Sequence, residues 1–254
     1  MVLKLGSRGK AVTSWQGFLS DLGMLAEPPD GVFGQNTHRA TLQFQTTNAV
    51  GATGELCANT LRAAEAAGFL GIGFYPPKPD FQPITTTAGR HALFGRLRFV
   101  RAPRAADRDA IRITNGWSDN LELVDVPQLA GVPFGWGGTC EGTVRFHKSG
   151  AAPLKGMFRD WEAAGLRRRI LTFDGAYNPR LMRGSRTVLS AHAFGSAIDL
   201  NAQWNGLGRV PASLGARGCV LELVRIASSH GFYWGGHFSS RKDGMHFELA
   251  RLPS

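Results

Sequence analysis

The chain has 254 residues, of which 43% are hydrophobic and 19% charged, so it is long enough for two ordinary domains. Lys and Arg outnumber Asp and Glu by 29 to 19, and the formal net charge of +10 favours a polyanionic partner such as nucleic acid, an acidic lipid surface or a bacterial wall. No apolar run approaches a membrane span, and Met1 to Lys10 lack a signal-peptide stretch. We therefore expect that the chain is made in a cytoplasm and does not insert into a membrane.

Residues 1–70 are predicted to form a bundle of three short amphipathic helices. The apolar residues of the first helix recur at helical spacing: Val12, Trp15, Phe18, Leu19 and Leu22. The second helix is expected from about Gln35, and the third from about Glu55 to a closing Gly68. Between the first two helices, prolines and glycines at 28–34 predict a tight reversal of the chain.

Residues 71–90 are predicted to be a linker, because they combine four prolines with the threonine run 85–87. Beyond them, alternating apolar and polar residues predict strands at 97–100, 111–114 and 121–126. Helical patterns return at 154–164 and 220–229. We therefore expect an α+β fold, with a small helical bundle joined by the linker to an α+β domain that spans 91–254 and contains an antiparallel sheet.

The basic residues argue against a nucleic-acid partner, and the cysteines argue against a disulfide framework. The one dense basic run, Arg167–Arg169, has no aromatic stacking platform or nucleic-acid motif beside it, so we expect no nucleic-acid partner. Cys57, Cys140 and Cys219 are odd in number and widely separated, which is typical of reduced structural thiols rather than of a disulfide framework.

Two segments carry the candidate metal chemistry. In 190–201, a glycine between His192 and Asp199 permits a bend that lets the two side chains converge. In 243–249, His246 begins an alternating strand and Asp243 lies three residues earlier. Three ligands with a fourth position for water are what a catalytic zinc ion needs, whereas structural zinc is closed by four residues. By spacing alone, however, core histidines bonded to aspartates are commoner than ligands.

The first domain resembles a known family through three motifs that occur in order. These are Leu-Gly-Ser-Arg-Gly at 5–9, Asp-Gly-Val-Phe-Gly at 30–34 and Phe-Gln at 44–45. Together they are similar to the three-helix peptidoglycan-binding domain. The alternative is a generic helical bundle whose glycines only serve turns.

The second domain resembles zinc peptidases. The patterns Ser-x-His-x-x-Gly-x-Ala-x-Asp at 190–199 and Asp-Gly-Met-His-Phe-Glu at 243–248 are similar to the D-alanyl-D-alanine carboxypeptidase family, which includes phage L-alanyl-D-glutamate endopeptidases. Shorter matching pieces are distributed over 115–117, 146–148, 175–180 and 231–236. The resemblance extends over roughly 95–250 and implies a single catalytic zinc ion as cofactor.

Carried over by position, the resemblance assigns the zinc ligands to His192, Asp199 and His246. It makes Asp243 the general base and later acid, where many relatives have the longer Glu, and Arg180 the group that stabilises the oxyanion. Arg183 is close enough in sequence to be the alternative to Arg180.

Other titratable residues are weaker candidates. His147 and His237 are the rival metal ligands; the first is expected at the surface and the second in a cleft wall. Glu141, Asp160 and Glu162 suggest a glycosidase pair, but nothing in the sequence holds two of them at a working separation.

The two resemblances together imply a peptidoglycan hydrolase that cuts the peptide stem, with bacterial peptidoglycan as its partner. The expected type is a phage endolysin, a monomer that is made in the host cytoplasm and reaches the wall after release. There it is expected to cut the L-alanyl-D-glutamate bond and lyse the cell, which would be an antimicrobial activity. The alternatives are a D-alanyl-D-alanine carboxypeptidase or dipeptidase and, in another class, a non-catalytic zinc-stabilised wall-binding protein.

Overall fold

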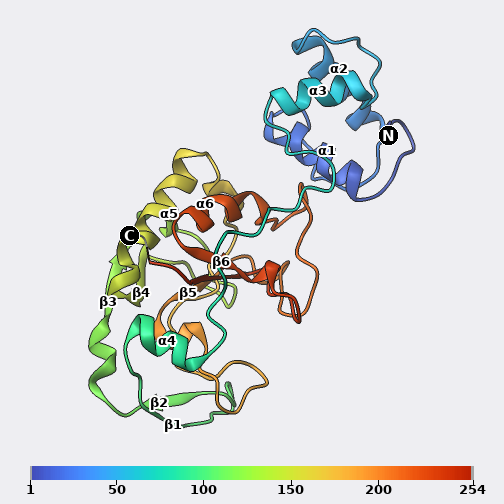
Figure 1. Cartoon of the computed structure of the whole chain (residues 1–254). Coiled ribbons are helices and arrows are strands. Elements are labelled where there is room, and N and C mark those ends of the chain that lie inside the picture. The colour runs from blue at the N-terminus through green and yellow to red at the C-terminus, as the bar shows by residue number, and fades with distance from the viewer. Residues whose placement is uncertain (1, 253–254) are drawn as a thin grey trace. The chain divides into compact units, whose positions relative to one another are not determined.

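The structure is a computed structural model that describes residues 2–252, and it divides into two compact units (Figure 1). The helical unit comprises Met1–Pro76 and Ala212–Leu221, and the α+β unit comprises Pro77–Pro211 and Glu222–Ser254. This combination of N-terminal helices with small antiparallel sheets confirms the predicted α+β fold class. Among the described residues, no helix is both long and apolar enough to cross a bilayer.

Three helices form the helical unit: α1 (Lys10–Asp21), α2 (Gln35–Thr47) and α3 (Ala58–Ala66). The fully buried Trp15 lies at the centre of its core, with ring centroids 5.5 Å from Phe44 and 5.7 Å from Phe69. Helix α3 begins three residues later than predicted. The reason is that Leu56 pairs in extended conformation with Leu3, whose carbonyl accepts its N–H at 2.9 Å.

Two buried glutamines fix the loops of this unit. The amide of Gln16 accepts the N–H of Gly31 at 2.8 Å and donates to the Asp30 carboxylate at 2.8 Å. Gln45 holds a second glycine turn in the same way, since its side-chain oxygen accepts the N–H of Gly54 at 2.8 Å. The glycine-containing loop motif and the Phe-Gln pair therefore have a structural reason: each buried amide satisfies backbone groups that a tight turn leaves unpaired.

The helical unit also includes a segment from far along the chain, Ala212–Leu221. The Ser14 hydroxyl donates to the Leu214 carbonyl at 3.1 Å. A Cβ on Gly17 would lie 2.3 Å from the Cα of Gly215, and a Cβ on Gly215 would lie 2.3 Å from the carbonyl oxygen of Thr13, so the two segments pack backbone to backbone. The sequence placed this segment in the second domain, because contacts between residues about 200 positions apart leave no periodic signal.

Helix α4 (Thr87–Phe94) begins inside the range predicted as linker. The side chain of Thr86 caps it by accepting the N–H of Gly89 at 3.0 Å. Threonine is unfavourable inside a helix but favourable at its N-cap, so the threonine run marks a helix start here. Arg90 and Phe94 are the buried residues of this helix.

Three small antiparallel sheets build the α+β unit. The hairpin strands are β1 (Phe99–Arg101) with β2 (Ile111–Ile113), and β3 (Leu121–Asp125) with β4 (Thr143–His147); the central sheet is β5 (Ala197–Asp199), β7 (His246–Leu249) and β6 (Phe232–Trp234), in the order β5-β7-β6.

Helices α5 (Ala151–Ala163) and α6 (Val224–Ser229) pack against the central sheet. The fully buried Trp161 joins them: its ring lies 5.9 Å from that of Phe247, and its indole N–H donates to the Leu223 carbonyl at 2.9 Å. The central sheet is therefore held rigid on the side away from its polar residues, which suits it to position a site.

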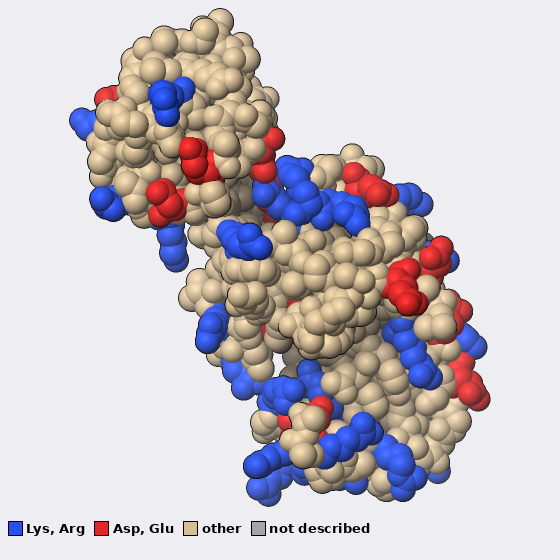
Figure 2. Space-filling model, turned by 180° about the vertical axis from the view of Figure 1, so that it is seen from behind, with Lys and Arg blue, Asp and Glu red and all other residues tan. Residues whose placement is uncertain are grey.

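Arginines gather on the β1–β2 hairpin. Figure 2 shows blue side chains clustered over the end of the molecule where Figure 1 places these strands. Six exposed arginines lie in or beside the hairpin: Arg96, Arg98, Arg101, Arg104, Arg108 and Arg112. A surface with this density of guanidinium groups attracts phosphate or carboxylate polymers.

Candidate metal centre

Strands β5 and β7 bring two of the predicted ligands together. Their antiparallel register places Asp199 directly opposite His246. His192 comes from the short helix Ala191–Phe194, after which Gly195 adopts the left-handed conformation at φ 55°. A Cβ at 195 would also lie 2.7 Å from the end of the Leu121 side chain, which would have to move, so the left-handed conformation is the main reason for glycine here. The bend predicted at this position is present.

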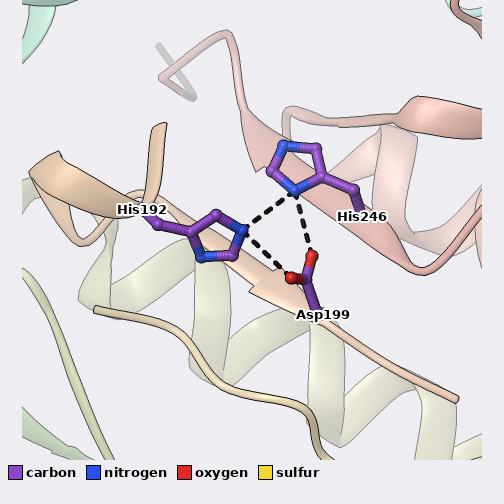
Figure 3. A group of neighbouring side chains, drawn as sticks. All are labelled: His192, Asp199 and His246. Atoms are coloured by element: carbon purple, nitrogen blue, oxygen red, sulfur yellow. Dashed lines mark hydrogen bonds and ion pairs between the residues drawn. The ribbon is translucent and has the colours of Figure 1, made fainter. Parts of the chain in front are cut away.

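The three side chains point toward one another and form a compact, buried cluster (Figure 3). The Nε2 atom of His192 lies 3.1 Å from Nδ1 of His246. The Asp199 carboxylate reaches both rings, with Oδ2 3.2 Å from His192 Nε2 and Oδ1 3.0 Å from His246 Nδ1. Within the described residues, this is the one group of three or more His, Cys, Asp or Glu that could hold a metal ion.

Partners on the far side of each imidazole fix its tautomer. His192 Nδ1 donates to the carbonyl of Ala176 at 2.6 Å, since a carbonyl can only accept. His246 Nε2 donates to the Glu248 carboxylate at 3.3 Å. Both inward-facing nitrogens are then free to present lone pairs to a metal.

This donor set fits a cation. Two imidazole lone pairs and a carboxylate converge on one point, and they repel one another unless a proton or a metal ion lies between them. The separations of 3.0–3.2 Å are close to the ligand–ligand edge of about 3.3 Å expected for tetrahedral zinc with bonds of about 2.0–2.1 Å. In the metal-free protein a proton takes this place: burial opposes it, but hydrogen bonds to Asp199 and Glu248 raise the pKa of His246 to about 10.

Glu248 connects the centre to helix α4. It is 3% exposed and lies on the same face of β7 as His246, two residues earlier in the strand. The guanidinium of Arg90, also 3% exposed, donates to the same carboxylate oxygen at 3.3 Å. Although burial opposes ionisation, His246 and Arg90 hold the pKa of Glu248 below its usual value. This carboxylate therefore stays charged and orients the His246 ring.

The structure places Asp243 within electrostatic range of the three candidate ligands. Its backbone carbonyl accepts the N–H of His246 at 3.1 Å, and its N–H donates to Gly235 at 2.9 Å. Within residues 2–252, the buried carboxylate oxygen Oδ1 has no hydrogen-bond partner. Burial, together with the negative charge of Asp199, raises the pKa of Asp243 to about 6, although both histidines and Arg180 oppose the shift. A carboxylate with this pKa is suited to take and return a proton near neutral pH.

Arg180 and Arg183 have different environments. Arg180 is half-buried, and its guanidinium lies within electrostatic range of Asp199 and Asp243. Burial lowers the pKa of Arg180, with a further contribution from Arg183. The Arg183 side chain is 52% exposed, with Nη1 3.8 Å from Asp107 and 3.7 Å from Asp109. Of the two arginines, Arg180 is thus the more buried, and its charge interacts with Asp199 and Asp243.

The rival histidines have structural environments. His147 is buried rather than at the surface; its Nε2 donates to the Phe94 carbonyl at 3.1 Å, and its Nδ1 accepts the N–H of Ser149 at 3.2 Å. His237 is 4% exposed and packs edge-on against Trp234, with ring centroids 5.1 Å apart. Neither belongs to the ligand cluster.

Sequence reasoning missed Arg90 and the role of Glu248. The second had a signal, because a His-x-Glu pair in a strand lies on one face. Arg90 had none, because it lies 158 residues from its carboxylate partner.

Comparisons with known proteins give the class of each part. Residues 8–64 match the family model of a peptidoglycan-binding domain, and residues 183–249 match that of D-alanyl-D-alanine carboxypeptidase. The second match contains both metal-ligand segments and Asp243, whereas Arg90 and Arg180 lie outside it. No curated protein matches the chain.

Among solved structures, the chain is similar to the N-terminal domain of SleB, with 30% identity and a TM-score of 0.26, over 26% of this chain and 92% of that one. The family matches show that the chain combines an N-terminal peptidoglycan-binding domain with a peptidase domain of the D-alanyl-D-alanine carboxypeptidase family. It is therefore a peptidase directed at peptidoglycan.

Proposed function

We propose that the protein is a zinc-dependent endopeptidase that cuts the L-alanyl-D-glutamate bond of peptidoglycan stems. The observation that supports it best is the convergence of His192, Asp199 and His246, with Asp243 at their side and a pKa of about 6. Two of the three proposed ligands are imidazoles whose outward N–H groups are held by Ala176 and Glu248, so displacement of the proton between them would leave two neutral nitrogen donors, as in catalytic zinc sites that keep one position open.

Zinc, Asp243 and Arg180 would each have a separate role in hydrolysis of the peptide bond. A zinc ion held by the three ligands would supply Lewis acidity and lower the pKa of the attacking water. Asp243 accepts the proton of that water on its carboxylate and then delivers it to the leaving amine. The Arg180 guanidinium stabilises the negative charge that develops on the stem carbonyl oxygen.

The pairing of the two domains supports the endopeptidase and a lytic role. A wall-binding domain raises the local concentration of the peptidase on an insoluble polymer, which favours cutting throughout the wall. We infer an enzyme of the phage endolysin type, made in the host cytoplasm and active once it reaches the wall.

Mass spectrometry of digested peptidoglycan tests this proposal directly. We expect new amino termini on D-glutamate, loss of activity with a chelator and recovery on addition of zinc. Release of free D-alanine with the L-alanyl-D-glutamate bond intact would show that the protein is a carboxypeptidase instead. Binding of zinc and wall without any new amino terminus would show a non-catalytic wall-binding protein.

A further inference from the structure

Trp136 is an exposed aromatic residue that the metal chemistry does not use. Its side chain is 68% exposed, whereas Trp15, Trp117, Trp161 and Trp234 are buried. One face of the indole stacks on Phe134, with ring centroids 4.9 Å apart and planes at 8°. The exposed fraction shows that much of the remaining ring surface meets solvent. An aromatic ring of this size is exposed at a measurable cost, because burying it would stabilise the fold.

The loop that carries Trp136 is held in place at several points. The Phe134 N–H donates to Gly138 at 2.9 Å, and the Gly137 N–H donates back to Phe134 at 3.1 Å. Gly135 packs so tightly on the Asp174 carboxylate that a Cβ there would collide with it. The indole is therefore presented by a closed turn, and little side-chain or loop entropy remains to be lost when a ligand contacts it.

The same loop is attached to the backbone that supports the metal ligands. Phe134 and Phe173 form a parallel bridge, and Phe173 bridges to Leu200, the residue that follows β5. The outer edge of the indole lies against Gly175, where a Cβ would be 3.6 Å from the ring. The carbonyl of Gly175 accepts the N–H of Asp199 at 2.9 Å. One glycine thus contacts both the exposed ring and a metal ligand.

We propose that Trp136 is a binding platform for a sugar ring of the glycan strand, next to the centre that cuts the attached stem. This inference rests on the proposed function and names the part of the substrate that the platform contacts. Pyranose rings present a flat face of C–H groups that complements the negative face of an indole. The stem residues nearest the proposed bond, L-alanine and D-glutamate, offer only a methyl group and a carboxylate. A sugar ring is thus the wall component that matches this surface.

The location also bears on which bond is cut. The L-alanyl-D-glutamate bond is close to the glycan, whereas the terminal D-alanyl-D-alanine bond is several residues away. A platform that shares Gly175 with the Asp199 backbone favours the bond near the sugar.

Steady-state kinetics on two soluble substrates test the platform. The substrates are a disaccharide-linked stem peptide and the same stem without sugar. Trp136→Ala should raise KM for the sugar-linked stem by about tenfold, which corresponds to about 1.4 kcal/mol and is typical of one aromatic stacking contact, with kcat unchanged. KM for the free stem should not change. Trp136→Tyr should restore most of the loss, because a tyrosine ring still offers an aromatic face.

Leu123→Ala is the matched control, since Leu123 is 75% exposed and should affect neither substrate. Equal loss on both substrates would overturn the inference in favour of a contact with the peptide, and no loss on either would overturn it outright. If wild type cuts neither stem, the proposed function fails, but the platform can still be judged separately. In that case the peptide-free disaccharide is added to wild type and to Trp136→Ala while tryptophan fluorescence is recorded. The same fluorescence change in both proteins would refute the sugar platform at Trp136.

Discussion

Replacing Asp243 by asparagine should separate catalysis from metal binding. The substitution keeps the volume of the side chain and leaves all three ligands in place, but an amide cannot accept the proton of the attacking water. Turnover on peptidoglycan should fall by roughly 10² to 10⁴, which is about 3–5 kcal/mol of transition-state stabilisation. Zinc content per chain should stay at the wild-type value.

In the metal-free protein, Asp243→Asn should become more stable relative to wild type as the pH rises. Burial raises the pKa of Asp243 from 3.8 to about 6, so its ionised form destabilises the fold by roughly 3 kcal/mol above that pH. The penalty is absent below the unfolded pKa of about 4, grows as the pH rises and is complete above about 6. Asparagine removes it but adds a buried amide that costs about 1–3 kcal/mol if unpaired. The melting temperature of the variant relative to wild type should therefore rise between pH 4 and 7.

Two variants complete the assay. Asp109→Asn replaces another half-buried carboxylate, near Arg183, and should keep full activity. His246→Ala removes a ligand, so it should lose both zinc and the thermal stabilisation that zinc provides. Wild-type turnover by zinc-loaded Asp243→Asn would refute the assignment of the base, and another residue would have to take that proton.

Three further predictions concern the pH, a buried ion pair and the wall. Because the pKa of His246 is raised to about 10, zinc must displace a proton; zinc affinity should rise with pH, and calorimetry in buffers of different ionisation enthalpy should detect the release. In the metal-free protein, the ion pair of protonated His246 with Asp199 should stabilise the fold below about pH 6.5, and this stabilisation should be lost as the pH rises through about 10. Arg90→Met should lower the free energy of unfolding by about 3–5 kcal/mol in denaturant titrations, against at most about 1 kcal/mol for Arg159→Met in an exposed pair. The full chain should sediment with purified peptidoglycan, whereas residues 77–254, which lack most of the helical unit, should bind less and clear intact walls more slowly.

The local pattern of the sequence was enough to predict much of the fold. Apolar residues at helical spacing located α1 and α2, and the alternation at 121–126 located β3, because each of these signals depends on neighbours a few residues apart. Strand β1 begins two residues later than predicted, at Phe99 rather than Leu97. The sequence does not predict helix α4, because threonine and proline disfavour a helix interior, although Thr86 is the cap that starts it.

The candidate site was predicted to the extent that its residues share short motifs. His192 and Asp199 lie on either side of a glycine bend, and His246 follows Asp243 by three residues, so spacing and resemblance found them. Trp136 lies in a loop whose position depends on a bridge to Phe173, and no local pattern shows that contact. Distant pairing is what the sequence alone did not reveal.

The contact between Arg90 and Glu248 shows why the peptidase domain has to be larger than its matched family segment. Residues 183–249 contain the three candidate ligands and Glu248, but the guanidinium that balances this buried carboxylate comes from α4. Without Arg90, Glu248 would be a buried charge with only His246 as partner, and burial would favour its neutral form. A protonated Glu248 could no longer hold the His246 Nε2 proton with a full negative charge, and the tautomer that frees Nδ1 would lose its support. The orientation of His246, a candidate metal ligand in the matched segment, thus depends on a residue nearly a hundred positions before that segment begins.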